Sequence, residues 1–99
     1  MLNITKTVEN TKAIISLEGR LDTITSPDTE AAIKEVLPEI TELILDFAKL
    51  EYISSAGLRV LLSAQKAMNA KGEMKIKNVG TAIMEIFEVT GFSDILTIE

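Results

Sequence analysis

The most informative part of the chain is Tyr52-Ile53-Ser54-Ser55-Ala56-Gly57-Leu58, where a strand-like run passes into a helix-like one. The run before it, residues 43–47, is short, apolar and followed by polar residues, which is typical of an interior strand. From Ala56 onward the apolar side chains recur at helical spacing and predict an amphipathic helix. Its apolar stripe consists of Leu58, Leu61, Leu62, Gln65 and Met68, with Arg59, Ser63 and Lys66 on another face.

Two adjacent hydroxyls therefore stand at a predicted helix N-terminus. The side-chain oxygen of Ser54 or Ser55 is placed to accept a hydrogen bond from an amide of the first turn, and that turn also favours an anion. Capping uses one serine and leaves the other unexplained, so a purely structural cap and a functional hydroxyl both stay open. Ala56 and Gly57 leave the neighbouring backbone sterically accessible to a partner protein or a phosphate.

The sequence offers these serines no catalytic partner. A serine nucleophile needs a general base beside it, and the chain has no His. We therefore expect the hydroxyl to accept phosphate from another enzyme rather than to catalyse a reaction itself, and an independent enzyme is the least supported class. With no His, no Cys and no calcium-type carboxylate loop, we predict neither a metal site nor a cofactor.

Composition restricts the class of protein. Ninety-nine residues with 46% hydrophobic content suit one core, so we predict a single domain over residues 1–99. The absence of Cys and of any long apolar stretch predicts a cytoplasmic protein without membrane insertion. A pI near 4.7, no cluster of Lys or Arg, and few aromatic residues argue against binding nucleic acid.

Strand-like and helix-like segments alternate along most of the chain, which predicts an α/β fold with a mixed sheet and helices packed on it. Asp46, in an otherwise apolar strand, is predicted to hydrogen-bond backbone at the strand end rather than to act as an acid. Ser26-Pro27 predicts a helix start, Pro38 its end, and residues 9–12 a hairpin turn. The predicted strands are residues 4–8, 13–17, 42–47, 74–76 and 96–98, and the predicted helices are 26–37, 56–70 and 81–89.

Several of these segments together resemble a known family. Leu45-Asp46-Phe47 followed by Ile53–Leu58 is similar to the signature of STAS domains, the group that contains the bacterial anti-sigma factor antagonists. Leu17–Asp22 resembles the segment after the family's second strand. Ile83, Ile86, Phe87 and Thr90-Gly91-Phe92 resemble its last major helix and the turn behind it. The resemblance implies the STAS fold, a single mixed sheet of about four or five strands with helices packed on it.

The resemblance also implies a phosphorylation switch. In such antagonists, the serine two positions before the loop glycine is phosphorylated by an anti-sigma factor that is also a serine kinase, and a serine phosphatase reverses the change. That position here is Ser55. The chain has Ser54 where the family often has Asp, and Ala56 where Ser or Thr is common. The implied partner-binding residues are Asp22, Ser54, Ser55, Ala56, Gly57 and Arg59, and Arg20 is a further candidate beside Asp22.

Two other classes stay open at this point. The first is a STAS adaptor that is never phosphorylated, for instance the accessory subunit of a lipid-transporting membrane ATPase, in which the serine segment serves only for docking. The second is an acyl carrier, which is also small and acidic with one reactive serine at a helix start. Acyl carriers are all-helical, so substantial strand content would exclude that class.

Overall fold

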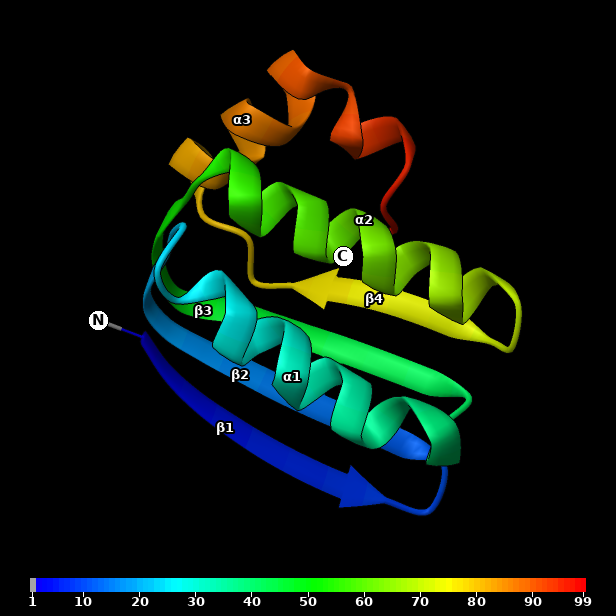
Figure 1. Ribbon diagram of the computed structural model, residues 1–99. Helices are drawn as coiled ribbons and strands as arrows, with labels where there is room; N and C mark the ends of the chain where they lie inside the picture. The colour runs from blue at the N-terminus through cyan, green and yellow to red at the C-terminus, as the bar shows by residue number, and fades with distance from the viewer. Residues whose placement is uncertain (1) are drawn as a thin grey trace.

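The computed structural model describes residues 2–99 and consists of one mixed four-stranded sheet with helices packed on it. The sheet order is β1-β2-β3-β4, with β1 antiparallel to β2 and the other neighbours parallel. The α1 and α2 helices lie on the same face of the sheet, roughly along the direction of the strands, and α3 lies beyond α2 (Figure 1). The strands are β1 (Leu2–Glu9), β2 (Lys12–Leu21), β3 (Glu42–Ile53) and β4 (Glu73–Lys77); the helices are α1 (Ser26–Val36), α2 (Ser55–Asn69) and α3 (Thr81–Thr90).

The predicted α/β arrangement is confirmed, and its boundaries follow local chemistry. The first two strands form the expected hairpin, and Asn10 adopts a left-handed φ of 58° in its turn. Pro27 lies in the first turn of α1, where its missing amide costs no hydrogen bond. The α3 helix ends at Gly91, whose φ of 82° is the left-handed conformation that glycine adopts without strain. The four strands also exclude the acyl carrier class.

The core lies between the helices and one face of the sheet. Alternate residues of the central strands point toward the helices, and the predicted stripe of α2 meets them, with only Leu62 half-buried. Phe47 of β3 and Phe87 of α3 are both buried, with ring centroids 6.5 Å apart, and so join α3 to the same core. The completely buried side chains include Ile15, Leu17, Leu21, Leu43, Leu45, Leu61, Met68, Met74 and Ile76.

The third strand is longer than predicted, because it runs through residues 42–53 instead of ending at Phe47. The pairing of β2 with β3 is irregular between Ser16 and Glu18 and between Gly19 and Arg20. Each irregularity adds a residue to β3 and shifts the side-chain alternation. As a result Leu50 and Ile53 are both buried although they are three positions apart. A strand with a broken period of two cannot be recognised by its alternation, and the strand prediction stopped where the alternation failed.

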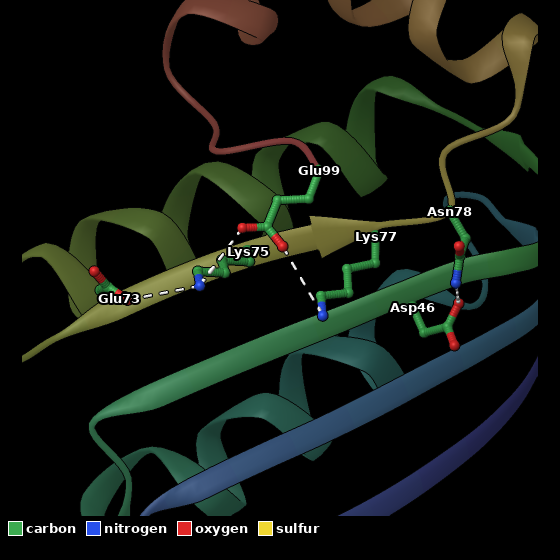
Figure 2. A network of polar contacts seen from close by, with 6 residues as sticks. All are labelled: Asp46, Glu73, Lys75, Lys77, Asn78 and Glu99. Atoms are coloured by element: carbon green, nitrogen blue, oxygen red, sulfur yellow. Dashed lines mark hydrogen bonds and ion pairs between the residues drawn. The ribbon is translucent and has the colours of Figure 1, made fainter.

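The segment predicted as a last strand, residues 96–98, contributes a single bridge from Ile98 to Ile76 of β4. Its backbone still covers the outer edge of β4, because the amide of Ile76 donates to Thr97 and the amide of Glu99 donates to Ile76, both at 2.9 Å. Glu99 also forms ion pairs with Lys75 and Lys77 (Figure 2).

Asp46 hydrogen-bonds backbone as predicted, although it lies inside β3 and not at its end. Its Oδ1 accepts hydrogen bonds from the amide of Ala48 at 2.9 Å and from Asn78 Nδ2 at 3.0 Å (Figure 2). These donors hold the pKa of the Asp46 carboxyl below its ordinary value, Asn78 making the largest contribution.

Candidate functional site

The candidate site lies where the carboxyl ends of β2 and β3 meet at one edge of the sheet. Leu21 and Ile53, the last residues of these parallel strands, are register partners. The amide of Ser54 donates to the carbonyl of Leu21 at 2.9 Å, which fixes the two chain segments beside each other just beyond the sheet. One segment leads into α1 and the other into α2, so both helix N-termini lie at this edge (Figure 1). Ligand sites of open α/β sheets characteristically form outside the carboxyl ends of the strands.

Residues Ser54–Gly57, which we call the serine junction, carry β3 into α2. Ser54 is the N-cap of α2, with extended backbone (φ −97°, ψ 175°), and its Oγ accepts a hydrogen bond from the amide of Gly57 at 3.3 Å. Ser55 is the first residue of the helix, and its side chain is exposed. The two hydroxyls therefore have different roles: one stabilises the helix end, and the other faces solvent.

Gly57 is needed for close packing and not for an unusual backbone conformation. A Cβ at this position would lie 2.8 Å from both Leu21 Cγ and Ile53 Cγ1 and 3.1 Å from the carbonyl oxygen of Leu21. Contacts shorter than 3.0 Å require the surrounding atoms to move. Gly57 thus lets the first turn of α2 approach the ends of β2 and β3 and places Ser55 directly beside them.

Residues Asp22–Thr25, which we call the Asp22 loop, connect β2 to α1 and are held by their own side chains. Asp22 Oδ1 accepts hydrogen bonds from the amides of Ile24 and Thr25, both at 3.0 Å. Thr25 Oγ1 donates to the carbonyl of Arg20 at 2.8 Å and accepts from the amide of Asp22 at 2.9 Å. The amide of Thr25 is the largest cause holding the pKa of Asp22 below its ordinary value. The loop thus has a defined backbone conformation in the free protein.

Exposed side chains of three kinds lie on the segments that adjoin the serine junction and the Asp22 loop. The guanidinium carbon of Arg20 lies 4.2 Å from the centre of the Tyr52 ring, a stacked cation–π pair on adjacent strands. Arg59 is exposed one helical turn beyond Ser55 and so shares its face of α2. Ile24, at the tip of the Asp22 loop, is 85% exposed.

Comparison with known proteins agrees with this geometry. A sequence model of the STAS domain matches residues 3–99. This chain belongs to the STAS domain family. A curated relative from Bordetella bronchiseptica, BtrV, described as a candidate anti-sigma factor antagonist, is 33% identical over 87 residues, which are 86% of this chain and 75% of BtrV.

Solved structures share the fold of this STAS domain. An anti-sigma factor antagonist from Mycobacterium paratuberculosis superposes with a TM-score of 0.90 at 20% identity, covering 99% of this chain and 85% of that one. The phosphorylated form of the Bacillus cell fate determinant SpoIIAA superposes with a TM-score of 0.76 at 20% identity, covering 100% of this chain and 91% of that one. At these identities the structures establish only the fold of the chain, whereas its family is established by the STAS model and by BtrV.

Most residues predicted for the site lie on the two segments that follow β2 and β3 and that are hydrogen-bonded to each other. Ser54, Ser55, Ala56 and Gly57 form the junction, and Asp22 lies just past the point where β2 is hydrogen-bonded to it. The Asp22 carboxylate is engaged by its own loop rather than directed only to solvent. Ser55 is not sealed from solvent, which the phosphorylation hypothesis requires.

The sequence patterns did not predict that Ile24 is exposed on the Asp22 loop or that Thr25 holds this loop. The only available signal was an isolated apolar residue between threonines in a short connection, and such a pattern does not distinguish a buried residue from an exposed one. Within residues 2–99, no group of three or more His, Cys, Asp or Glu side chains is placed to hold a metal ion. None of the helices in the same range is long and apolar enough to span a membrane.

Proposed function

We propose that this STAS domain, acting as one unit over residues 1–99, is a phosphorylation-controlled anti-sigma factor antagonist in the cytoplasm. With Ser55 unmodified it binds an anti-sigma factor that is also a serine kinase, and the sigma factor is released. The kinase then phosphorylates Ser55 and lets the antagonist go, and a serine phosphatase restores it. The proposal rests on the different environments of the two serines: Ser54 caps α2, while the hydroxyl of Ser55 is exposed and accessible for modification.

The site supports an acceptor of phosphate and not a catalyst. The chain contains no His or Cys to act as the usual general base for a serine. An exposed hydroxyl in the first turn of a helix is accessible to a kinase, and its phosphate would lie near helix amides that favour an anion. SpoIIAA, which shares the fold, has been solved in a phosphorylated form and in an unphosphorylated one.

The switch acts through local charge. A phosphoserine carries about 1.5 to 2 negative charges at pH 7. At an interface formed around a neutral hydroxyl, that charge would be buried without a partner, at a cost of several kcal/mol. Because each 1.4 kcal/mol changes affinity about tenfold, even part of this cost releases the partner. The fold itself does not need to change.

The test is to incubate the protein with the purified anti-sigma factor kinase of its source organism and ATP, and to locate phosphate by mass spectrometry. We expect phosphate on Ser55 in the wild type and in Ser54→Ala, and none in Ser55→Ala. We expect Ser55→Ala to bind the kinase persistently and Ser55→Asp to bind at least about tenfold more weakly. Equal binding by these two variants would show that charge at residue 55 does not control the complex.

A second candidate is a STAS adaptor that is never phosphorylated. The observation that favours it is Ser54, which stands where the family often has Asp and uses its oxygen as a helix cap, so it supplies no carboxylate beside the acceptor. An adaptor would take up no phosphate from any serine kinase of the source organism, and purification from native cells would recover it with a membrane transport ATPase.

A further inference from the structure

The two edges of the sheet differ. The edge at β4 is covered, because the amide of Ile76 donates to Thr97 and the amide of Glu99 donates to Ile76. At the β1 edge, no segment of residues 2–99 continues the sheet, and no backbone hydrogen bond beyond the strand ladder involves this strand (Figure 1). β1 pairs with β2 over its whole length without a bulge and contains no proline. Such a regular, open edge is a template for a further strand.

The outward backbone groups of β1 belong to its even-numbered residues. A two-residue turn joins β1 to β2, and in such a hairpin the flanking residues, here Glu9 and Lys12, form a hydrogen-bonded pair. The neighbouring carbonyl of Thr11 points the other way and accepts from the amide of Thr41, just before β3. Hydrogen-bonded pairs recur at every second residue, so the odd-numbered residues of β1 bond to β2. The amides and carbonyls that face the open edge are those of Leu2, Ile4, Lys6 and Val8.

The side chains of β1 specify what kind of strand fits this edge. On the side covered by the helices, Leu2 and Ile4 pack against the core, and Val8 is 48% exposed. The opposite side carries uncharged polar side chains, those of Asn3, Thr5 and Thr7. A strand added here must alternate apolar and uncharged polar residues in the same way, because neighbouring strands share both faces of a sheet. β1 itself has this pattern, so a second copy of the chain supplies a matching strand.

An antiparallel pair of β1 strands is self-complementary when its twofold axis passes through Thr5. Ile4 then lies opposite Lys6 of the second copy, and Leu2 lies opposite Val8 of the second copy. All of these residues direct their amides and carbonyls to the open edge, so each pair exchanges both hydrogen bonds. The exposed side chain of Val8 gains an apolar neighbour, and no charged side chain lies directly opposite a like charge.

Charge and shape near the axis also suit two copies. Lys6 Nζ forms an ion pair with Glu35 Oε1 of α1 at 2.7 Å, so two such pairs flank the axis and opposite charges balance there. Ala31, one helical turn before Glu35, is exposed and small, which leaves room for α1 of the second copy. Other registers fit less well: an axis at Lys6 would set two lysines opposite each other, and an axis at Ile4 or Thr7 would leave outward groups unpaired.

We infer that β1 is a dimerisation edge, which pairs antiparallel with β1 of a second copy about an axis at Thr5 and joins the two sheets into one. The serine junction lies at the end of the sheet where β1 begins, because Leu2 pairs with Gly19 near the end of β2. The two junctions therefore lie at opposite ends of the dimer, and Ser55 of each copy stays exposed. The dimer contact goes beyond the proposed function and does not depend on it.

Disulfide trapping tests the register, because the chain has no Cys of its own. In Thr5→Cys the two thiols face each other across a non-hydrogen-bonded pair, whose Cα separation of about 4.5 Å lies within the range of disulfides. The matched control is Thr7→Cys, which is exposed on the same face but displaced from its counterpart by about 13 Å along the strands. With oxidised glutathione, we expect Thr5→Cys to form the covalent dimer at least about tenfold faster than Thr7→Cys.

Sedimentation velocity at up to about 1 mM protein measures the affinity, because a contact of one strand belongs to the small, weak class of interfaces. Val8→Pro removes an outward amide without breaking the ladder to β2, and Lys6→Glu surrounds the axis with carboxylates. We expect each change to raise the Kd of the dimer at least about tenfold. Adding Glu35→Lys to Lys6→Glu balances the charges again and should return the Kd to within about threefold of the wild type. Urea unfolding of each variant confirms that it is folded, and the charge variants test the edge even if Val8→Pro is unstable.

Two results would overturn the inference. A wild type that stays monomeric at about 1 mM, with Thr5→Cys cross-linking no faster than Thr7→Cys, would show that no second copy binds this edge. A dimer that keeps its affinity in both Val8→Pro and Lys6→Glu would show that the copies associate through another surface. A kinase that fails to phosphorylate Ser55 would refute the proposed function and leave the dimer unaffected, so the two failures are distinguishable.

Discussion

The division of labour between the two serines can be tested without any partner, by comparing the stability of Ser54→Ala and Ser55→Ala. Ser54 Oγ satisfies an amide of the first turn of α2, whereas Ser55 is exposed at the first helical position. Loss of an N-cap serine costs about 0.5 to 2 kcal/mol. The bond to Gly57 is 3.3 Å long, above the usual 2.9 to 3.0 Å for an amide donor, so we expect a loss of roughly 1 kcal/mol.

Ser55→Ala should leave the free energy of unfolding within about 0.5 kcal/mol of the wild type, because it removes an exposed group from a position where alanine is a good helix former. The assay is urea unfolding followed by far-ultraviolet circular dichroism. For a domain of this size the slope is about 1 to 3 kcal/mol per molar urea, so Ser54→Ala should lower the midpoint by roughly 0.3 to 1 M. The melting temperature should fall by about 4 to 8 °C.

The matched control is Ser54→Asp, which keeps a side-chain oxygen at the cap and adds a negative charge that the helix N-terminus favours. It should retain the stability of the wild type. An equal loss of stability in Ser55→Ala and Ser54→Ala would contradict this assignment, because the exposed hydroxyl would then be the cap. A Ser54→Asp variant as unstable as Ser54→Ala would also contradict it, because the cap bond would then contribute nothing.

Three further outcomes follow from the structure. Gly72→Ala should lose roughly 3 kcal/mol of stability in the same urea assay, because its Cβ would lie 1.8 Å from the carbonyl oxygen of Thr41. The control is Gly80→Ala, whose Cβ would have no neighbour within 4 Å and which should lose at most about 1 kcal/mol. The pKa of Asp46 in the folded state lies below its ordinary value of 3.8, so the ionised carboxylate stabilises the fold above that pH. This stabilisation is lost as the pH falls through the lower pKa of the folded state. When stability is measured against pH, Asp46→Asn should therefore lose less stability than the wild type between about pH 5 and pH 2. Ser55→Asp should shift amide resonances only in residues 52–62 and the Asp22 loop, and widespread shifts elsewhere would contradict a local electrostatic switch.

Much of this architecture is determined by local patterns in the sequence. Apolar periodicity indicated each helix and the first parts of the strands, and the paired serines followed by helical spacing placed a helix N-terminus at the functional junction. Pro27 and Gly91 are equally local signals, because each marks a helix end through the backbone of one residue. The lack of His and Cys can also be read directly from the sequence, and it leaves the serines without their usual general base. The junction could therefore be found before the fold was known.

Other features of the molecule depend on pairing between distant segments, so they cannot be read from local patterns. The irregular register of β2 against β3 carried the third strand on to Ile53, and no pattern within 42–53 reveals the partner that imposes those shifts. The close approach at Gly57 requires Leu21, which is far away in the sequence, because the contacts form only where the ends of β2 and β3 meet. The exposure of Ile24 likewise appears only in the folded loop, where its amide is hydrogen-bonded to Asp22. Periodicity records which side of an element is apolar, whereas register and burial depend on the partner that packs against it.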